Sequence, residues 1–433
     1  MKKLFLPTIA LGAALALGGC SFGFESDNLL HPPKTTGREA AIEKLVEEAS
    51  GGSYKLKYPN SGSYRSAIVT EDFNSDGTDE AIAFFSAGSE KSVHLLVMCS
   101  DKDGDWKNCG DFDTGYTEVD SVLFADYDFD GTSEILVGFS GTGDLNELLV
   151  FDYDKDKKTT VKNEFTTSYS GFCAGDYDRD GGSEILAFTI ESGETASEAK
   201  LIDYDNSVLY TLATCPMDTN VTRFDNICSG LLNKETMGVA VDGALEKGFN
   251  TQIIYYDSDK TELLNYPLTT GKKQAPTYRT YSVKSQDIDQ DGFIEIPITD
   301  AEPPSGAANA ASIINWRSLN TEKSKLSDKL RCISNLDYGF YFKLPDYFTN
   351  DVYAVMSDDS RETDSVSGSD ANGEKLLTIR VFDVGATSEK MKGYSTLESY
   401  NQYIYAYKLG DSETLYVDDN TVRENFALND ISA

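Results

Sequence analysis

Four short acidic segments with one common spacing are the residues of this chain best suited to chemistry. Each places oxygen-bearing side chains at loop positions 1, 3, 5 and 9 and glycine at position 6, and the backbone carbonyl at position 7 can add another oxygen. Hard cations such as Ca2+ take roughly six to eight oxygen ligands, and a sharp turn at glycine directs alternate residues of a loop inward. The sequence therefore predicts about four structural Ca2+ sites, with these candidate ligands: Asp72, Asn74, Asp76, Thr78 and Glu80; Asp126, Asp128, Asp130, Thr132 and Glu134; Asp176, Asp178, Asp180, Gly182 and Glu184; Asp287, Asp289, Asp291, Phe293 and Glu295.

Catalytic motifs are absent from the sequence. A Ser-His-Asp or Cys-His site would have to use His31 or His94, and His94 alternates with apolar neighbours in a strand-like run, which favours a structural role. The sequence has no phosphate-binding glycine loop or His-Glu-x-x-His, and its Gly-x-Ser-x-Gly match, at residues 19–23, overlaps the predicted lipidation site. Glycoside hydrolysis needs only two carboxylates, but metal loops and exposed turns account for the acids. We therefore predict no catalytic residues.

The elements that position the loops repeat along the chain. Acidic turns recur around Asp103, Asp154, Asp205 and Asp257, each after a strand-like run, so each unit has about fifty residues. Each unit is predicted to contain four strands, with the metal loop between the first two, which is typical of a propeller blade. The interval between the third and fourth loops has room for two units, so residues 221–243 are predicted to form a blade whose loop has lost its acids. The prediction is a mainly β fold, with a β-propeller of about five four-stranded blades over residues 61–335.

This pattern resembles the FG-GAP/VCBS repeats, the calcium-bearing propeller units of integrin α chains and many bacterial surface proteins. The resemblance rests on the Asp/Asn-x-Asp-Gly loops and the strands that follow them. Many members of the family carry Asp at position 9, where this chain has Glu80, Glu134, Glu184 and Glu295. That difference alters the reach of the side chain and leaves the ligand type unchanged.

The N-terminus is predicted to be a targeting segment. Two lysines precede an apolar run over residues 4–17, which is short for a membrane span. Leu17-Gly-Gly-Cys20 resembles a bacterial lipobox, so we expect a lipoprotein signal peptide at residues 1–20 and lipidation of Cys20. The alternative is an ordinary signal peptide with an incidental cysteine. The lipoprotein interpretation places the chain at the extracytoplasmic face of the bacterial cell membrane, with a tether and an amphipathic helix at residues 21–60.

The helix has its own signals. A capping box at Thr36-Gly-Arg-Glu39 is predicted to start it and Gly51-Gly52 to stop it. Its apolar face is expected to pack on the edge of the propeller.

Residues 336–433 are predicted to form a small α+β domain, because the repeat is absent from them. Strands are expected at 339–345, 352–356, 376–382 and 415–417, a helix at 395–408, and a polar loop at 357–373. Disulfides are permitted by an exported location. Cys99 and Cys109 flank a turn as hairpin neighbours would, Cys215 and Cys228 are close in sequence, and free thiols are an equal alternative for Cys173 and Cys332.

A formal net charge of −34 argues against binding of nucleic acid or anionic membranes through the folded body. The order of lipobox, helix, propeller and C-terminal domain resembles a group of uncharacterised Gram-positive surface lipoproteins. The expected function is that of a monomeric, lipid-anchored cell-surface protein for adhesion or envelope interaction, with a glycan, wall polymer or protein as ligand. The alternatives are a carbohydrate-active enzyme (polysaccharide lyase or hydrolase) on a propeller scaffold, and a scaffolding lipoprotein of an envelope complex.

Overall fold

The computed structural model describes residues 37–140, 143, 145–267, 275–299, 310–348, 352–367, 373–412 and 417–428. The predicted signal peptide, Cys20, His31 and Thr36 lie outside the described residues. Within the described part, the chain forms 27 strands and two helices, so the mainly β prediction is confirmed. Neither of these helices combines the length and apolar character that a bilayer span requires.

Antiparallel sheets of consecutive strands follow one another along the chain, the first with five strands and the next three with four each. The first sheet contains β1 (Tyr54–Leu56), β2 (Ile68–Glu71), β3 (Glu80–Ala87), β4 (His94–Ser100) and β5 (Trp106–Asp113). Both β1 and β2 pair with β3. The second contains β6 (Glu118–Ala125), β7 (Glu134–Ser140), β8 (Asn146–Asp154) and β9 (Thr159–Tyr169). The third contains β10 (Gly171–Gly175), β11 (Glu184–Thr189), β12 (Glu198–Asp205) and β13 (Val208–Pro216).

The fourth sheet is the unit predicted to lack an acidic loop. It contains β14 (Arg223–Leu231), β15 (Met237–Ala244), β16 (Phe249–Asp257) and β17 (Glu262–Tyr266). A short turn without aspartates, residues 232–236, joins its first two strands. Residues 221–243, predicted to form a blade, thus supply the first two strands of this four-stranded sheet.

The last sheet is larger and has ten strands. One part contains β18 (Ile296–Thr299), β19 (Ala310–Asn320), β20 (Lys325–Asn335), β21 (Phe340–Lys343) and β27 (Phe426–Leu428). The other contains β22 (Val352–Met356), β23 (Glu362–Ser367), β24 (Glu374–Asp383), β25 (Ser395–Tyr400) and β26 (Tyr403–Leu409). Because β19 pairs with β18 and β20 and also with β22, strand pairing continues across residue 336.

Two predictions for the C-terminal part are wrong. The helix predicted at 395–408 is the hairpin of β25 and β26, and the segment 357–373 contains β23. Ser395-Thr-Leu-Glu398 matches a helix-capping box, but aromatic and β-branched residues favour strands, and Tyr403–Leu409 pairs with β24. The helix of this region is α2 (Asp419–Asn425), capped by Asp418. The strand predicted at 415–417 lies largely outside the described residues.

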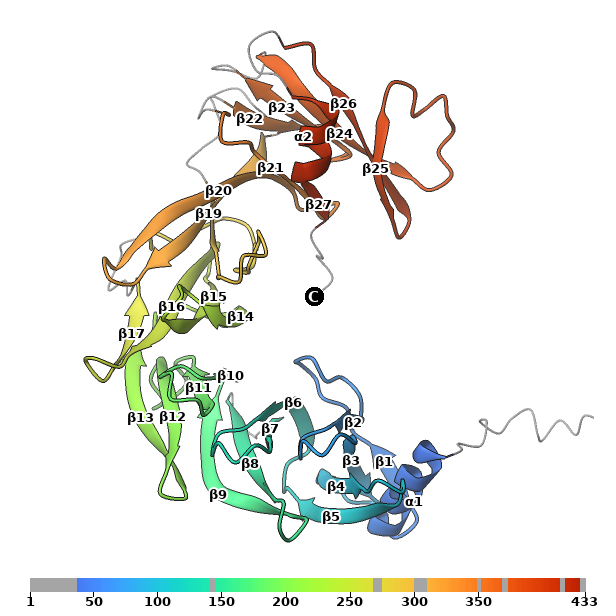
Figure 1. The fold of residues 1–433 in the computed structure, drawn as a ribbon, viewed down its shortest axis with the longest axis vertical. Coiled ribbons are helices and arrows are strands. Elements are labelled where there is room, and N and C mark those ends of the chain that lie inside the picture. Colours follow the sequence, from blue (N-terminus) through green and yellow to red (C-terminus); the bar gives the residue numbers. More distant parts are fainter. Residues whose placement is uncertain are drawn as a thin grey trace, which may run out of the picture.

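Adjacent sheets bury apolar faces against each other. One core joins the first and second sheets through residues such as Phe84 and Val137, and another joins the second and third sheets. A third core joins the third and fourth sheets, and a fourth joins the fourth sheet to β18 and β19. Figure 1 shows the sheets following one another along an open arc from α1 to the C-terminal sheet. Each of the second, third and fourth sheets thus has neighbours on both faces, as stacked repeats require.

Helix α1 (Arg38–Ser50) covers the outer face of the first sheet. Ile42 and Val46 pack on Ala83, Phe85 and other residues of β3 and β4. The helix ends at Gly51, which adopts a left-handed conformation as predicted, whereas its N-cap is Gly37 and not Thr36. In a closed propeller the last blade would cover this face. Since α1 covers it instead, a closed ring is not formed here.

Candidate metal sites

In the first three sheets the acidic loop joins two paired strands, β2 to β3, β6 to β7 and β10 to β11. The loops span residues 72–79, 126–133 and 176–183 in the first three sheets, and residues 287–294 lead into β18. The residue at position 9 opens or directly precedes a buried strand, so its carboxyl group is carried into the interior. The four position-9 glutamates are at most 2% exposed: Glu80, Glu134, Glu184 and Glu295.

Two backbone reversals shape all four loops. Position 4 has a positive φ of 56° to 69° although no glycine stands there, at Ser75, Phe129, Arg179 and Gln290. The glycine at position 6 also has a positive φ, between 85° and 105° in the four loops. Glycine adopts such angles at little cost, whereas other residues are strained. The repeated strain at position 4 indicates that all four loops fold in the same way.

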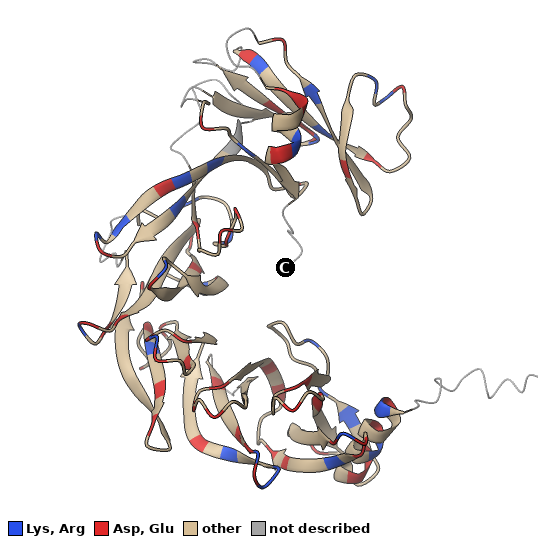
Figure 2. Cartoon of the chain, viewed as in Figure 1, with Lys and Arg blue, Asp and Glu red and all other residues tan. Residues whose placement is uncertain are grey.

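The reversals bring carboxylates together. Ligand atoms lie within 4.8 Å of one another in three groups: Asp176, Asp178, Asp180 and Glu184; Asp287, Asp289, Asp291 and Glu295; Asp126, Asp128 and Asp130. The acids of the first loop, Asp72, Asp76 and Glu80, are not brought together in this way, and Asn74 contributes an amide there. In the second loop Glu134 is outside the group. Figure 2 shows acidic residues in the loops of successive sheets along the arc. These clusters can bind metal ions.

Main-chain N–H groups hold the carboxylates in place. In the first loop Asp72 accepts hydrogen bonds from the N–H groups of Asp76 at 3.1 Å and Gly77 at 3.0 Å, and the second and fourth loops repeat both bonds. In all four loops the position-7 N–H donates to the position-5 carboxylate at 2.8–3.0 Å. The N–H groups use only some of the acceptor sites on each carboxylate, so others can face a cation.

Burial perturbs the position-9 glutamates. It raises the pKa of Glu80 and of Glu295 to about 7, of Glu184 to about 8 and of Glu134 to about 9, and nearby aspartates add to each shift. Three of them accept a position-2 N–H, from Tyr127, Tyr177 or Ile288. A buried carboxylate costs free energy unless it is paired or coordinates a metal.

Several oxygens in the loops have no hydrogen-bond partner. Both carboxyl oxygens of Glu80 are buried without one, and so are Asp176 Oδ1 and Asp289 Oδ1. A divalent cation at the loop centre would satisfy these atoms. The predicted donors are all oxygens, which suits Ca2+ and does not suit metals that prefer sulfur or imidazole. The predicted ligand set therefore fits the ion.

Two lysines that the sequence did not mark lie at the loops. Lys155 Nζ is 3.2 Å from Asp130 Oδ2. Lys329 Nζ contacts the carboxylate of Asp291 and lies 3.7 Å from Asp289 Oδ2. Both come from other strands or turns, so spacing within a loop could not reveal them.

The fourth sheet holds a buried ion pair that sequence reasoning also missed. Asp242 in β15 and Arg279 are 2.9 Å apart, and both side chains are 1% exposed. Asp242 also accepts hydrogen bonds from Thr251, Ser285 and Asn226. The pair ties the segment after β17 to this sheet.

Histidine and cysteine play structural roles where they are described. His94 stacks on Phe85 with ring centroids 5.2 Å apart and lies near Glu90 and Asp111. Cys99 and Cys109 form a disulfide between β4 and β5. The remaining described cysteines are free: Cys173, Cys215, Cys228 and Cys332.

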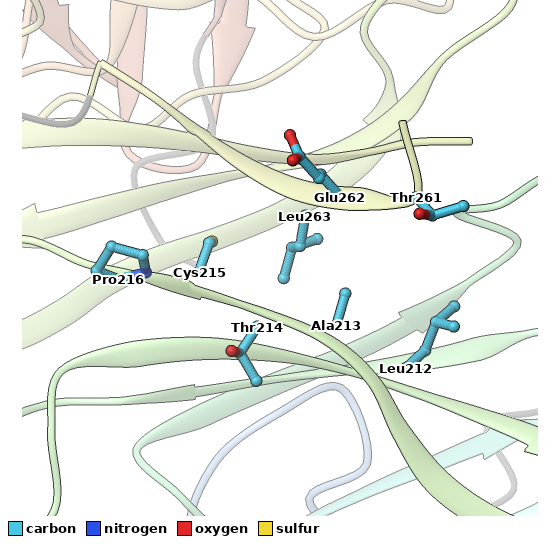
Figure 3. A pocket seen from close by; sticks show the side chains of 8 residues that line it. All are labelled: Leu212, Ala213, Thr214, Cys215, Pro216, Thr261, Glu262 and Leu263. Carbon is cyan, nitrogen blue, oxygen red and sulfur yellow. The ribbon is translucent and has the colours of Figure 1, made fainter. Parts of the chain in front are cut away.

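A groove of about 370 Å³ lies between the edge strands β13 and β17. Figure 3 shows its lining: Leu212, Ala213, Thr214, Cys215, Pro216, Thr261, Glu262 and Leu263. Glu262 is its one carboxylate, so this groove does not offer the pair of acids that glycoside hydrolysis needs.

Comparisons with known proteins identify no family for the chain. No family model matches the sequence, and no curated protein matches it. A solved structure described as the exotype rhamnogalacturonan lyase YesX aligns at a TM-score of 0.34 with 10% identity, over 82% of this chain and 63% of that one. The chain thus spans less than two thirds of that protein, and a likeness at this level carries no functional argument.

Proposed function

We propose that this chain is a lipid-anchored surface protein whose body is an open, propeller-like array of FG-GAP/VCBS-type blades stabilised by Ca2+. The cations would bind the four Asp-x-Asp/Asn-x-Asp-Gly loops, and the array would present a binding surface outside the cell. Its ligand would be a glycan, a wall polymer or a protein. The observation that carries the calcium role is the convergence of carboxylate oxygens, within 4.8 Å of one another, in the loops at Asp126–Asp130, Asp176–Glu184 and Asp287–Glu295.

The energetic scale supports a structural role for the ions. Extracellular calcium modules bind with a Kd of about 10⁻⁴ to 10⁻³ M. At tenfold excess over Kd each site adds about 1.4 kcal/mol, so four add about 6 kcal/mol. This amount is comparable to the 5–15 kcal/mol or so of net stability of typical domains.

The calcium role is tested by thermal melts of the full-length protein in detergent, with chelator and with millimolar Ca2+. We expect Ca2+ to raise the melting temperature, and Asp180→Asn in the third loop to reduce the gain. Asp156→Asn, in the exposed turn after β8, is the matched control and should behave as the parent does. An equal melting temperature in chelator and in Ca2+ would overturn the proposal.

The surface role needs its own tests. Labelling with a fatty-acid precursor should mark the parent and not Cys20→Ala, which should be released from the membrane. Recovery of one polymer or protein from native envelopes, lost in Asp180→Asn or in chelator, would support Ca2+-dependent adhesion. Cleavage of a recovered polymer would instead favour the enzyme alternative.

A further inference from the structure

We propose, on the basis of the calcium role above, that Lys155 and Lys329 are built-in competitors for the cation. They would make the second and fourth loops weaker sites than the third, so that the loops fill in sequence as Ca2+ rises. The proposal concerns two side chains outside the loops, and it deepens the proposed function by assigning regulation to the same sites.

Both ammonium groups lie on the position-5 aspartate of a loop. Lys155, in the turn between β8 and β9, contacts the carboxylate of Asp130 at 3.2 Å and donates a hydrogen bond to the Asp130 carbonyl. Lys329, in β20, donates to the carboxylate of Asp291 and also reaches Asp289 Oδ2 at 3.7 Å. A cation that used these carboxylates would meet an ammonium group already bound to them.

The third loop differs in this respect. Among the described residues, no lysine or arginine lies within ion-pair distance of its four carboxylates, and Asp176 Oδ1 has no hydrogen-bond partner. The residue that contacts this loop from the turn after β16 is uncharged: Ser258 Oγ donates a hydrogen bond to the Asp178 carbonyl at 3.3 Å. Among the three loops with four acidic side chains, the third is therefore the one whose carboxylates have no ammonium partner in the described residues; Arg179, at its position 4, is exposed and forms no ion pair there.

Competition follows from electrostatics. An ammonium group and a divalent cation repel each other at the distances within one loop, so the lysine must leave when the ion enters. Loss of a partly exposed ion pair, together with residual repulsion between the lysine and the cation, should lower the affinity of the loop for Ca2+ about tenfold. In the absence of Ca2+ the same lysine partly neutralises the loop. The second and fourth loops therefore depend less on the ion than the third.

The test is a Ca2+ titration of the full-length protein in detergent by calorimetry, with a chromophoric chelator as competitor. The parent should show one tight class of site and at least one weaker class. Lys155→Met and Lys329→Met should each raise the affinity of one weaker site about tenfold, and the double variant should raise both. Lys157→Met is the matched control, because Lys157 is in the same turn as Lys155 but pairs with Asp154, outside the metal loop.

Two further variants assign the classes. Asp180→Asn should remove the tight class, whereas Asp130→Asn should remove a weaker site and leave the tight one. Circular dichroism of each variant separates misfolding from altered binding. If the parent binds Ca2+ but the lysine variants titrate as the parent or Lys157→Met does, this inference fails and the calcium role stands. If the parent binds no Ca2+, both fail.

Discussion

Glu80 gives the sharpest test of the metal-loop reasoning, because its charge should destabilise the protein without Ca2+ and stabilise it with Ca2+. Burial, with the charges of Asp76 and Asp72, raises its pKa from 4.5 to about 7. Between these pH values the folded, metal-free protein holds a proton that the unfolded chain releases. The stability that this proton contributes is complete below pH 4.5 and is lost as pH rises through about 7. At pH 8 the loss is about 3 kcal/mol for this one residue.

Glu80→Gln removes the titration. In chelator at pH 8 the variant should be more stable than the parent by up to about 3 kcal/mol, or about 3 °C in melting temperature for a chain of this size. At pH 5 the two should differ little. With Ca2+ the order should reverse at pH 8, because a neutral amide is a weaker ligand than a carboxylate. The assay is thermal melting from pH 5 to pH 9, with chelator and with saturating Ca2+.

Glu246→Gln provides the control, since Glu246 is an exposed residue beyond the end of β15. It should leave the pH dependence and the effect of Ca2+ as they are in the parent. Two results would contradict this account of Glu80: a Glu80→Gln protein no more stable than the parent in chelator at pH 8, or a gain in melting temperature from Ca2+ as large as that of the parent.

Three further perturbations test other parts of the fold. Arg279→Leu leaves the Asp242 charge buried and should cost about 3–5 kcal/mol in urea unfolding, with partial recovery when Asp242→Asn is added. Cys99→Ala should lower stability by about 3 kcal/mol, the value for a loop of this length, and reductant should then have no further effect. Val46→Asp should detach α1 and expose the first sheet, so light scattering should report association; a stable monomer would contradict the capping role.

The metal loops could be predicted because their geometry is local. Asp126, Asp128 and Asp130 converge through reversals at Phe129 and Gly131, all within one short segment. Spacing alone therefore located the three carboxylate groups. The same holds for the end of α1, where Gly51 adopts the left-handed conformation that stops a helix.

What the sequence could not give depends on contacts between distant segments. Lys329 of β20 contacts the fourth loop, and Arg279, in the segment after β17, pairs with Asp242 of β15. Neither pairing produces a periodic pattern in the sequence. The hairpin at 395–409 was mistaken for a helix for a related reason. A helix and a strand were both locally possible there, and pairing with β24 decided between them.

The ends of the array explain why it is open. Inner sheets such as the second bury one face on each neighbour, through Val137 on one side and Leu136 on the other. The first sheet has a neighbouring sheet on one face only, and its other face, with Phe85 and Met98, would be exposed without α1. A ring would cover that face with the last unit, but in the last unit Ile314 and Trp316 of β19 pack on Val283 and Ile288 from the segment before β18. Both terminal units thus use flanking segments of the chain where a ring would use each other, and loss of α1 should cause association through the uncovered face.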